Sequence, residues 1–138
     1  MSHVAANLRG SDRAEVFASH GQTGAEAVFT SVAMSCHVRG IVGDDGQPAG
    51  LCGVTRRGVI WLLATPALVA SPSHRWQFLR AGRLWVNRML ATFRRLENWC
   101  DARNTATVRW LRGLGFTVHP PAPFGKMGLP FHHFTRLA

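Results

Sequence analysis

The run from Leu96 to Phe116, LENWCDARNTATVRWLRGLGF, contains the change of hydrophobic period that decides the fold. Its first part, Leu96 to Cys100, is short and rich in apolar side chains, which predicts a strand. Asn104 predicts the start of a helix, because its amide oxygen can accept hydrogen bonds from free backbone N–H groups. Apolar side chains then recur at helical spacing, at Val108, Leu111 and Leu114.

Two glycines end this helix. Gly113 and Gly115 interrupt the pattern, and Gly115 stands where helices commonly end in a left-handed conformation. The segment 116–119 predicts another strand, which Pro120 and Pro121 end because proline cannot donate to a sheet ladder. The run therefore predicts strand, helix and strand in succession, an order that many α/β domains share.

The residues of this run resemble those of the Gcn5-related N-acetyltransferases, the GNAT superfamily. In that family an Asn opens the corresponding helix, and a bulky residue, a short spacer and Gly-Phe end it; here Asn104 and Leu114-Gly115-Phe116 stand at those places. The run is most similar to acetyltransferase-like proteins of tailed phages, some of them small internal virion proteins, through Glu97-Asn98-Trp99, Asn104-Thr105, Arg109-Trp110-Leu111 and Gly115-Phe116. The resemblance is specific over residues 96–118, weaker over 47–95 and faint before that.

Length and composition predict one globular domain over residues 1–138. The hydrophobic content is 46%, but the longest apolar run, Val59 to Ala64, is too short to span a bilayer. The N-terminus lacks a secretion signal pattern, so we expect the chain in the cytoplasm or in a phage particle assembled there. The three cysteines have no C-x-x-C spacing, and we expect each to be a buried, reduced thiol rather than part of a disulfide or zinc site.

The net charge of +9 comes from fifteen Arg and one Lys against seven acids. A polyanionic partner would suit it, either nucleic acid or the phosphates of coenzyme A. The alternative explanation is that an Arg-rich and Ala/Gly-rich composition reflects a GC-rich genome. The prediction of nucleic acid as a partner rests on charge alone.

The rest of the chain predicts two helices followed by a meander. A first strand is expected at Val4–Leu8, a helix from Ser11 or Asp12 to about Ser19, and a second helix at Thr23–Ser35, where Thr23 and Glu26 are spaced as a capping box. Three strands follow at 37–42, 49–55 and 59–65. After a loop at 66–73, a long helix capped by Ser71 or Ser73 reaches about Phe93. Residues 120–130 predict a loop, and 131–137 a last strand beside 116–119.

This order matches the fold that the GNAT resemblance implies. It is an α/β (α+β) domain with a central mixed, mostly antiparallel sheet of about six to seven strands, flanked by about four helices. The resemblance also implies acetyl-CoA as co-substrate. The backbone of the strand at Trp61-Leu62-Leu63 would hold the coenzyme arm, so Leu62 and Leu63 are candidate binding residues, as is Asn104.

The loop that cradles the coenzyme pyrophosphate in the family is rich in glycine, whereas residues 66–75 here contain none. Ser73, His74 and Arg75 are the candidates to replace it, because hydroxyls and an Arg at a helix N-terminus attract anions. The alternative is an ordinary capped helix start. Helix capping and coenzyme binding would use the same side chain of Asn104, so the sequence leaves both interpretations open.

Glu97 is the candidate general base, because it lies on the strand that leads into the deciding run. The alternative is a surface or salt-bridging residue. His37, His119, His132 and His133 are further candidates by residue type only. The chain has no Tyr, the usual acid of the family; Leu111 occupies its place, so water, Cys100 or a His would have to protonate the leaving thiolate.

Two functions follow. The first is an N-acetyltransferase that moves acetyl from acetyl-CoA to an amine of an unknown small molecule or protein. The second is a non-catalytic phage virion or assembly protein that keeps the fold and contacts phage structural proteins. We expect no metal site, because the adjacent His132 and His133 point to opposite faces of a strand.

Overall fold

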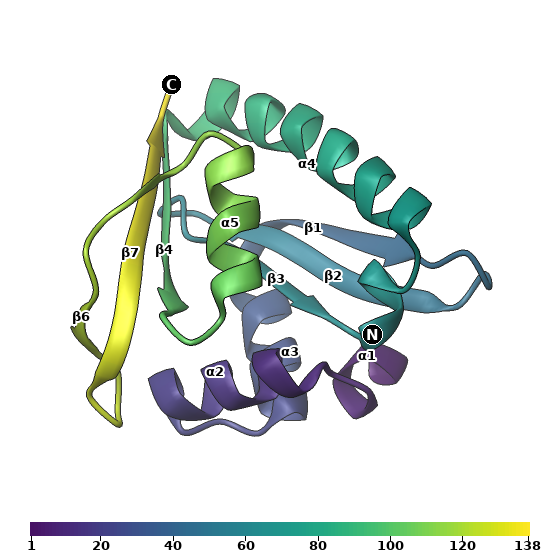
Figure 1. Cartoon of the computed structure of the whole chain (residues 1–138), viewed down its shortest axis with the longest axis horizontal. Helices are drawn as coiled ribbons and strands as arrows, with labels where there is room; N and C mark the ends of the chain where they lie inside the picture. The colour runs from purple at the N-terminus through teal and green to yellow at the C-terminus, as the bar shows by residue number, and fades with distance from the viewer.

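The computed structural model describes residues 1–138 as two antiparallel sheets that meet edge to edge, with helices on both faces (Figure 1). One sheet consists, in spatial order, of β1 (Ser35–Val42), β2 (Pro48–Thr55) and β3 (Ile60–Ala64). In the other, β7 (Leu129–Leu137) lies between β4 (Arg95–Asp101) and β5 (Thr117–Val118), and it also pairs with β6 (Ala122–Phe124). The predicted α/β class and mostly antiparallel arrangement of seven strands are confirmed.

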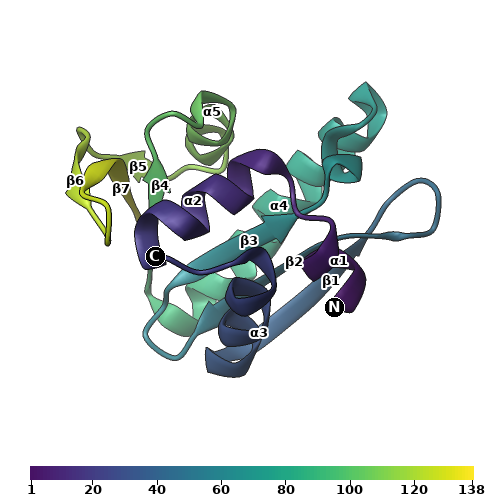
Figure 2. The same cartoon turned by 90° about the horizontal axis from the view of Figure 1, so that it is seen from below.

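The helices divide between the two faces. In Figure 1, α4 runs across the top while α2 and α3 lie at the bottom, and Figure 2 shows the lower layer from beneath. The helices are α1 (Ser2–Ala6), α2 (Gly10–His20), α3 (Gly24–Met34), the short 3-10 helix η1 (Pro66–Val69), α4 (Pro72–Phe93) and α5 (Thr105–Gly113). None of them combines the length and the apolar character that a membrane crossing requires.

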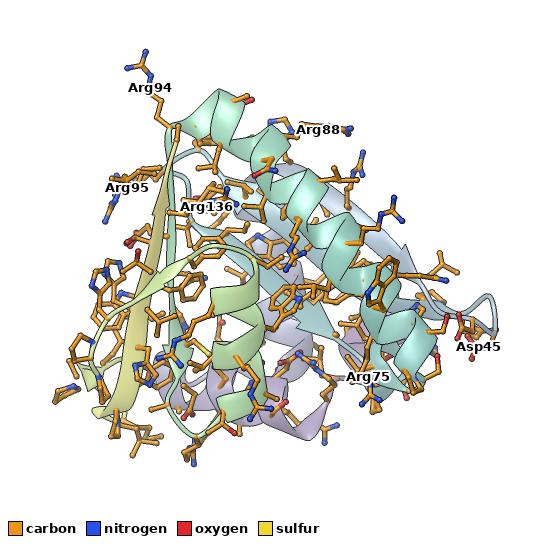
Figure 3. The ribbon with its side chains drawn as sticks, turned by 45° about the horizontal axis from the view of Figure 1, so that its top comes forward. Asp45, Arg75, Arg88, Arg94, Arg95 and Arg136 are labelled. Carbon is orange, nitrogen blue, oxygen red and sulfur yellow. The ribbon has the colours of Figure 1, made fainter.

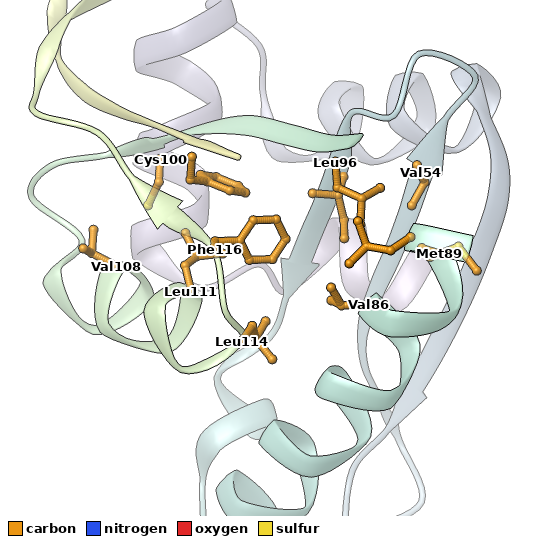
Figure 4. Close-up of a cluster of buried hydrophobic side chains, with 12 residues drawn as sticks. Val54, Val86, Met89, Leu96, Cys100, Val108, Leu111, Leu114 and Phe116 are labelled. Carbon is orange, nitrogen blue, oxygen red and sulfur yellow. The ribbon is translucent and has the colours of Figure 1, made fainter. Parts of the chain in front are cut away.

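Three apolar clusters hold these layers together, and two of them contain most of the clustered side chains. The larger one fills the space between α4, α5 and the sheets, as Figure 4 shows. Its labelled members are Val54, Val86, Met89, Leu96, Cys100, Val108, Leu111, Leu114 and Phe116. The second cluster lies on the opposite face of β2 and β3, where Leu51 and Leu63 pack against α1 and α3. Because successive side chains of a strand point to opposite faces, Ile60 of β3 packs in the larger cluster and Leu63 in the second.

The local signals for helix starts are largely confirmed. The hydroxyl of Thr23 accepts the N–H of Glu26, and the hydroxyl of Ser71 accepts the N–H of His74. The Asn104 side-chain oxygen accepts the N–H of Thr107 at 3.4 Å. Gly115 has φ +89° directly after α5, as predicted for a residue that ends a helix.

Four expectations are wrong. Val4–Leu8 is not a strand: Ser2–Ala6 is helical, and Val4 and Leu8, four residues apart, are both buried in the second cluster. α2 begins at Gly10 without a side-chain cap, because Asp12 bonds to Arg9 and to β3 instead. The region 120–130 contains β6, an edge strand in which Pro is tolerated. Cys36 is exposed and Cys52 is only partly buried, whereas both were expected to be buried.

A turn before β3 joins the two sheets and generates the first prediction. Gly58 has φ +82°, and a Cβ there would lie 2.4 Å from the carbonyl oxygen of Arg95. Gly46 has a similar φ of +79° but open space around it.

Gly46→Ala should therefore cost about 1–2 kcal/mol of unfolding free energy through backbone strain alone. Gly58→Ala should cost ~1–3 kcal/mol more, because the overlap must also displace β4. Urea unfolding of both variants measures the difference, and equal losses would mean that β4 does not constrain this turn.

Candidate active site

The two sheets are joined at one end and separate toward the other. The joint is a single parallel bridge between Val59 and Glu97, where Glu97 N–H donates to the carbonyl of Gly58 at 3.0 Å. The amide nitrogen of the Asn98 side chain then donates to the carbonyl of Ile60 at 2.7 Å. Beyond this point the described bonds between β3 and β4 end, and the edge of β3 opens to a split between the sheets.

The backbone of Leu62 faces this split. In an antiparallel ladder the N–H and C=O of one residue point to the same side, and the side alternates along the strand. The carbonyl of Ile60 accepts from Asn98, and both backbone groups of Ala64 bond to α2 and the residue before it. Residues 60 and 64 thus point away from β2, so Leu62 between them presents its N–H and C=O to the split. Leu63 points the opposite way, and its side chain is buried in the second cluster.

Glu97 lies beside the joint and pairs with a histidine that sequence reasoning could place only by residue type. Its Oε2 is 2.5 Å from Nε2 of His133, and each side chain is about one quarter exposed. His133 belongs to β7, where it is paired with Trp99 and lies diagonally across from Glu97. The His133 ring packs against Trp99 at 4.7 Å and against His119 at 5.5 Å between ring centroids. These contacts hold the carboxylate and the imidazole together in one orientation.

A cavity of about 1130 Å³ includes the split and extends to α3 on one face of the sheet and to α4 on the other. It brings together Leu62, Leu63, His74 and Glu97 from the predicted site residues. Ser73 and Arg75 lie outside this lining and are exposed on the first turn of α4. Asn104 lies at a separate cavity of about 140 Å³ beside Asp101 and Arg103. The predicted site residues therefore lie at three places. Leu62, Leu63, His74 and Glu97 line the main cavity, Ser73 and Arg75 lie outside it at the start of α4, and Asn104 lies at the smaller cavity.

The N-terminus of α4 carries few free backbone donors. Ser71 caps the N–H of His74, Arg75 N–H donates to the Ser71 carbonyl, and Pro72 has no N–H. The ring of His74 turns inward, with Nδ1 2.5 Å from the carbonyl oxygen of Leu68 in η1. The Ser71 hydroxyl also donates to the carboxylate of Asp44 at 3.1 Å, which places a negative charge of the chain itself at this helix end. An incoming phosphate would have to compete with these contacts.

Two buried donors on α5 have no hydrogen-bond partner. They are Nδ2 of Asn104 and Nε1 of Trp110. The Trp110 ring lines the main cavity and stacks on Phe78 of α4, with centroids 5.1 Å apart. Because buried donors are normally paired, both positions suit a ligand that supplies acceptor oxygens.

Comparison with solved structures identifies the fold. No protein-family model matches the sequence, and no curated protein matches it. A putative GNAT-family acetyltransferase from Bordetella pertussis superposes with a TM-score of 0.58 at 15% identity, covering 83% of this chain and 78% of that chain. The fold is that of the GNAT acetyltransferases.

Two further structures agree. A GNAT-family acetyltransferase from Streptococcus pneumoniae has a TM-score of 0.56 at 16% identity, covering 84% of this chain and 77% of that chain. A spermidine N-acetyltransferase from Vibrio cholerae has a TM-score of 0.54 at 11% identity, covering 81% of this chain and 72% of that chain. At these identities the likeness establishes the GNAT fold, and the chemistry has to be argued from the site.

Carboxylates close the open end of the split in this GNAT fold. Asp12 of α2 accepts from Arg9 and, at 2.8 Å, from the N–H of Ala64 at the end of β3. Glu15, one turn further along α2, accepts the N–H of Asp101 at the end of β4 at 2.7 Å. α2 thus ties both strands together where they are furthest from the joint. Composition and spacing carried no signal for this role, because it depends on contacts 52 and 86 residues apart in the sequence.

Burial and neighbouring charges change the acid–base properties of this cluster. Burial raises the pKa of Glu15 to about 7, against the hydrogen bond from Asp101 N–H, and the nearby carboxylates of Asp12 and Asp101 add to the increase. Hydrogen bonds from Arg103 outweigh burial at Asp101 and lower the pKa of that carboxyl. Glu15 also lines the cavity, so it is a proton-holding group that sequence reasoning missed.

The raised pKa of Glu15 predicts a pH-dependent stability. Between its ordinary pKa near 4.5 and the folded value of about 7, the folded state binds more protons than the unfolded state, so stability falls as pH rises through this window. Glu15→Gln can still accept the Asp101 N–H but cannot ionise. We therefore expect this variant to gain about 2–3 kcal/mol over wild type at pH 8 and to lose most of that advantage at pH 5.

Urea unfolding at both pH values measures the effect. Glu26→Gln on α3 serves as the matched control, because Glu26 is exposed. A Glu15→Gln variant with the wild-type pH dependence would show that Glu15 is not the group that titrates.

Proposed function

We propose that this protein is an N-acetyltransferase that binds acetyl-CoA in the split and transfers the acetyl group to an amine. The observation that carries the proposal is the free N–H and C=O of Leu62 at the edge of β3, facing a cavity that also contains Glu97. An extended amide-bearing arm can pair with such an edge as an added strand would. The GNAT fold supports the same conclusion.

Each predicted residue has a role in this proposal. Leu62 holds the coenzyme arm through its backbone, and Leu63 supports that strand from the second core. Asn104 and Trp110 supply unpaired donors on the α5 side. Ser73, His74 and Arg75 belong to the start of α4, where Arg75 is free to reach a phosphate and His74 fixes the turn from within.

The chemical step is direct attack. The amine nitrogen forms a bond to the thioester carbonyl carbon, and Glu97 takes the proton that the amine loses. The C–S bond then breaks and the thiolate leaves with the coenzyme. Burial raises the pKa of the Cys100 thiol well above its usual range, so Cys100 retains its proton and water protonates the thiolate. His133 orients Glu97 throughout.

A second function has its own support. The start of α4 is filled by the chain's own groups, since Ser71 caps it and Asp44 places a carboxylate there. A non-catalytic phage virion or assembly protein that keeps the GNAT fold would need no phosphate site. The similarity of residues 96–118 to phage acetyltransferase-like proteins also favours this alternative, with phage structural proteins as partners and a host-cytoplasmic or virion location.

Thermal unfolding with and without acetyl-CoA at moderate salt separates the two functions. At about a hundred times its dissociation constant, a ligand adds roughly 2.7 kcal/mol to stability. We expect acetyl-CoA to raise Tm by several degrees, and inorganic polyphosphate of equal charge to leave it unchanged. No shift with acetyl-CoA would overturn the enzyme proposal in favour of the virion protein.

The same titration tests the contact between Asp44 and Ser71. Asp44→Asn removes the negative charge from the start of α4, so acetyl-CoA should bind about two- to fivefold more tightly, equivalent to ~0.3–1 kcal/mol. Asp45→Asn is the matched control, because it removes the same charge from a neighbour whose carboxylate accepts the N–H of Gln47 instead. Equal effects of the two variants would show that only the net charge of the turn matters.

Glu97→Gln tests the proton acceptor. Removing a general base should lower kcat/KM about 10²- to 10⁴-fold in an acetylation assay over a panel of amines. The acetyl-CoA dissociation constant should stay within about twofold of wild type, because the Leu62 edge is intact. Full activity of the variant would mean that another group takes the proton.

A further inference from the structure

The outer face of α4 and α5 is strongly basic. Neither helix contains an Asp or Glu. The exposed arginines of this basic face are Arg80, Arg83, Arg88, Arg109 and Arg112. In Figure 3, Arg88 extends from α4 into solvent, while the labelled acid, Asp45, lies at the tip of the β1–β2 turn.

No carboxylate neutralises the basic face. The ion pairs of the chain join Arg9 to Asp12, Arg103 to Asp101 and His133 to Glu97, and all three lie elsewhere. Arg83 donates to the carbonyl of Gly113 at 3.0 Å, which ties α4 to the end of α5. The exposed arginines of α4 and α5 therefore have no ion-pair partner within the chain.

An aromatic side chain lies within this surface. Trp76 is 62% exposed, although tryptophan is usually well buried. The guanidinium of Arg80 sits 5.5 Å from the centroid of its ring. An exposed indole beside arginines is the combination that binds single-stranded nucleic acid, because a splayed base stacks on the ring while the arginines contact phosphates.

We propose that the basic face binds single-stranded nucleic acid, with Trp76 stacking on a base and Arg80 and Arg88 on the phosphate backbone. A duplex keeps its bases stacked internally and would use the charges alone. A membrane surface is a poorer match, because the apolar stripe of α4, including Val86 and Met89, is buried in the core. The site is separate from the acetyl-CoA cavity, whose lining includes neither Trp76 nor Arg88.

The charge contribution is tested by fluorescence anisotropy with labelled 20-nucleotide oligo-dT and oligo-U over a range of salt concentrations. For single strands the slope of log K against log salt is about −0.7 for each phosphate contact. Arg88→Gln should reduce the magnitude of this slope by about 0.7. The control is Lys126→Gln, which removes one charge from the turn between β6 and β7 and should leave the slope unchanged. Equal effects of the two variants would overturn the proposal in favour of diffuse attraction.

The stacking contribution has its own pair of variants. Trp76→Ala should weaken oligo-dT and oligo-U binding by roughly 5- to 150-fold, the range for one base stacked on an aromatic ring, while leaving binding to a 20-base-pair duplex unchanged. Leu84→Ala is the control, because Leu84 is 65% exposed on the same helix but has no ring. Unchanged single-strand affinity of Trp76→Ala, or displacement of the oligonucleotide by phosphatidylserine vesicles, would overturn the proposal. Excess coenzyme A should not compete, so this result is independent of the acetyltransferase proposal.

Discussion

The structure depends on how β3 and β4 are held at their two ends and left apart between them. At the joint, backbone and amide hydrogen bonds connect Gly58 to Glu97 and Ile60 to Asn98. At the far end, two carboxylates on one helix, α2, reach the last N–H of each strand. Because an unpaired strand edge would otherwise attract another strand, this double fixation is what allows Leu62 to present free backbone groups to a cavity instead of closing the sheet.

The way in which the split is held also shows which part of the structure distinguishes the two proposed functions, namely the start of α4. The free edge of β3 follows from the split itself, and the Glu97–His133 pair lies beside the joint. The start of α4 is independent of the joint, and here it is stabilised by groups of the chain: the Ser71 cap, the inward His74 ring and the Asp44 carboxylate. Phosphate affinity therefore depends on how easily a surface carboxylate is displaced, which is a modest electrostatic cost at an exposed site.

Residues whose role is local could be predicted from the sequence, and residues whose role is tertiary could not. Each helix cap is a hydrogen bond between residues three apart in the chain, made by Asn104, Ser71 and Thr23. The local sequence was therefore sufficient to predict these caps. Glu15 and His133 act through partners 86 and 36 residues away. The strand predicted at Val4–Leu8 was wrong for the same reason. A short apolar stretch is compatible with a strand or a helix, and packing against Leu51 and Leu63 favours the helix. Periodicity also missed β6, whose single proline, Pro123, is tolerated because the strand lies at an edge.

The positions of the acidic residues determine how the positive net charge is distributed over the surface. Asp12, Glu15 and Asp101 accept backbone N–H groups at the open end of the split, and Glu97 pairs with His133 near the joint. Four of the seven acids are thus used inside the fold, which leaves Glu26, Asp44 and Asp45 as the acids of the remaining surface. A GC-rich genome would account for the many arginines of the chain but not for this separation. The carboxylates that hold the two strands of the split in place are no longer available to neutralise surface arginines. The helices α4 and α5, which contain no acids, therefore present a basic face.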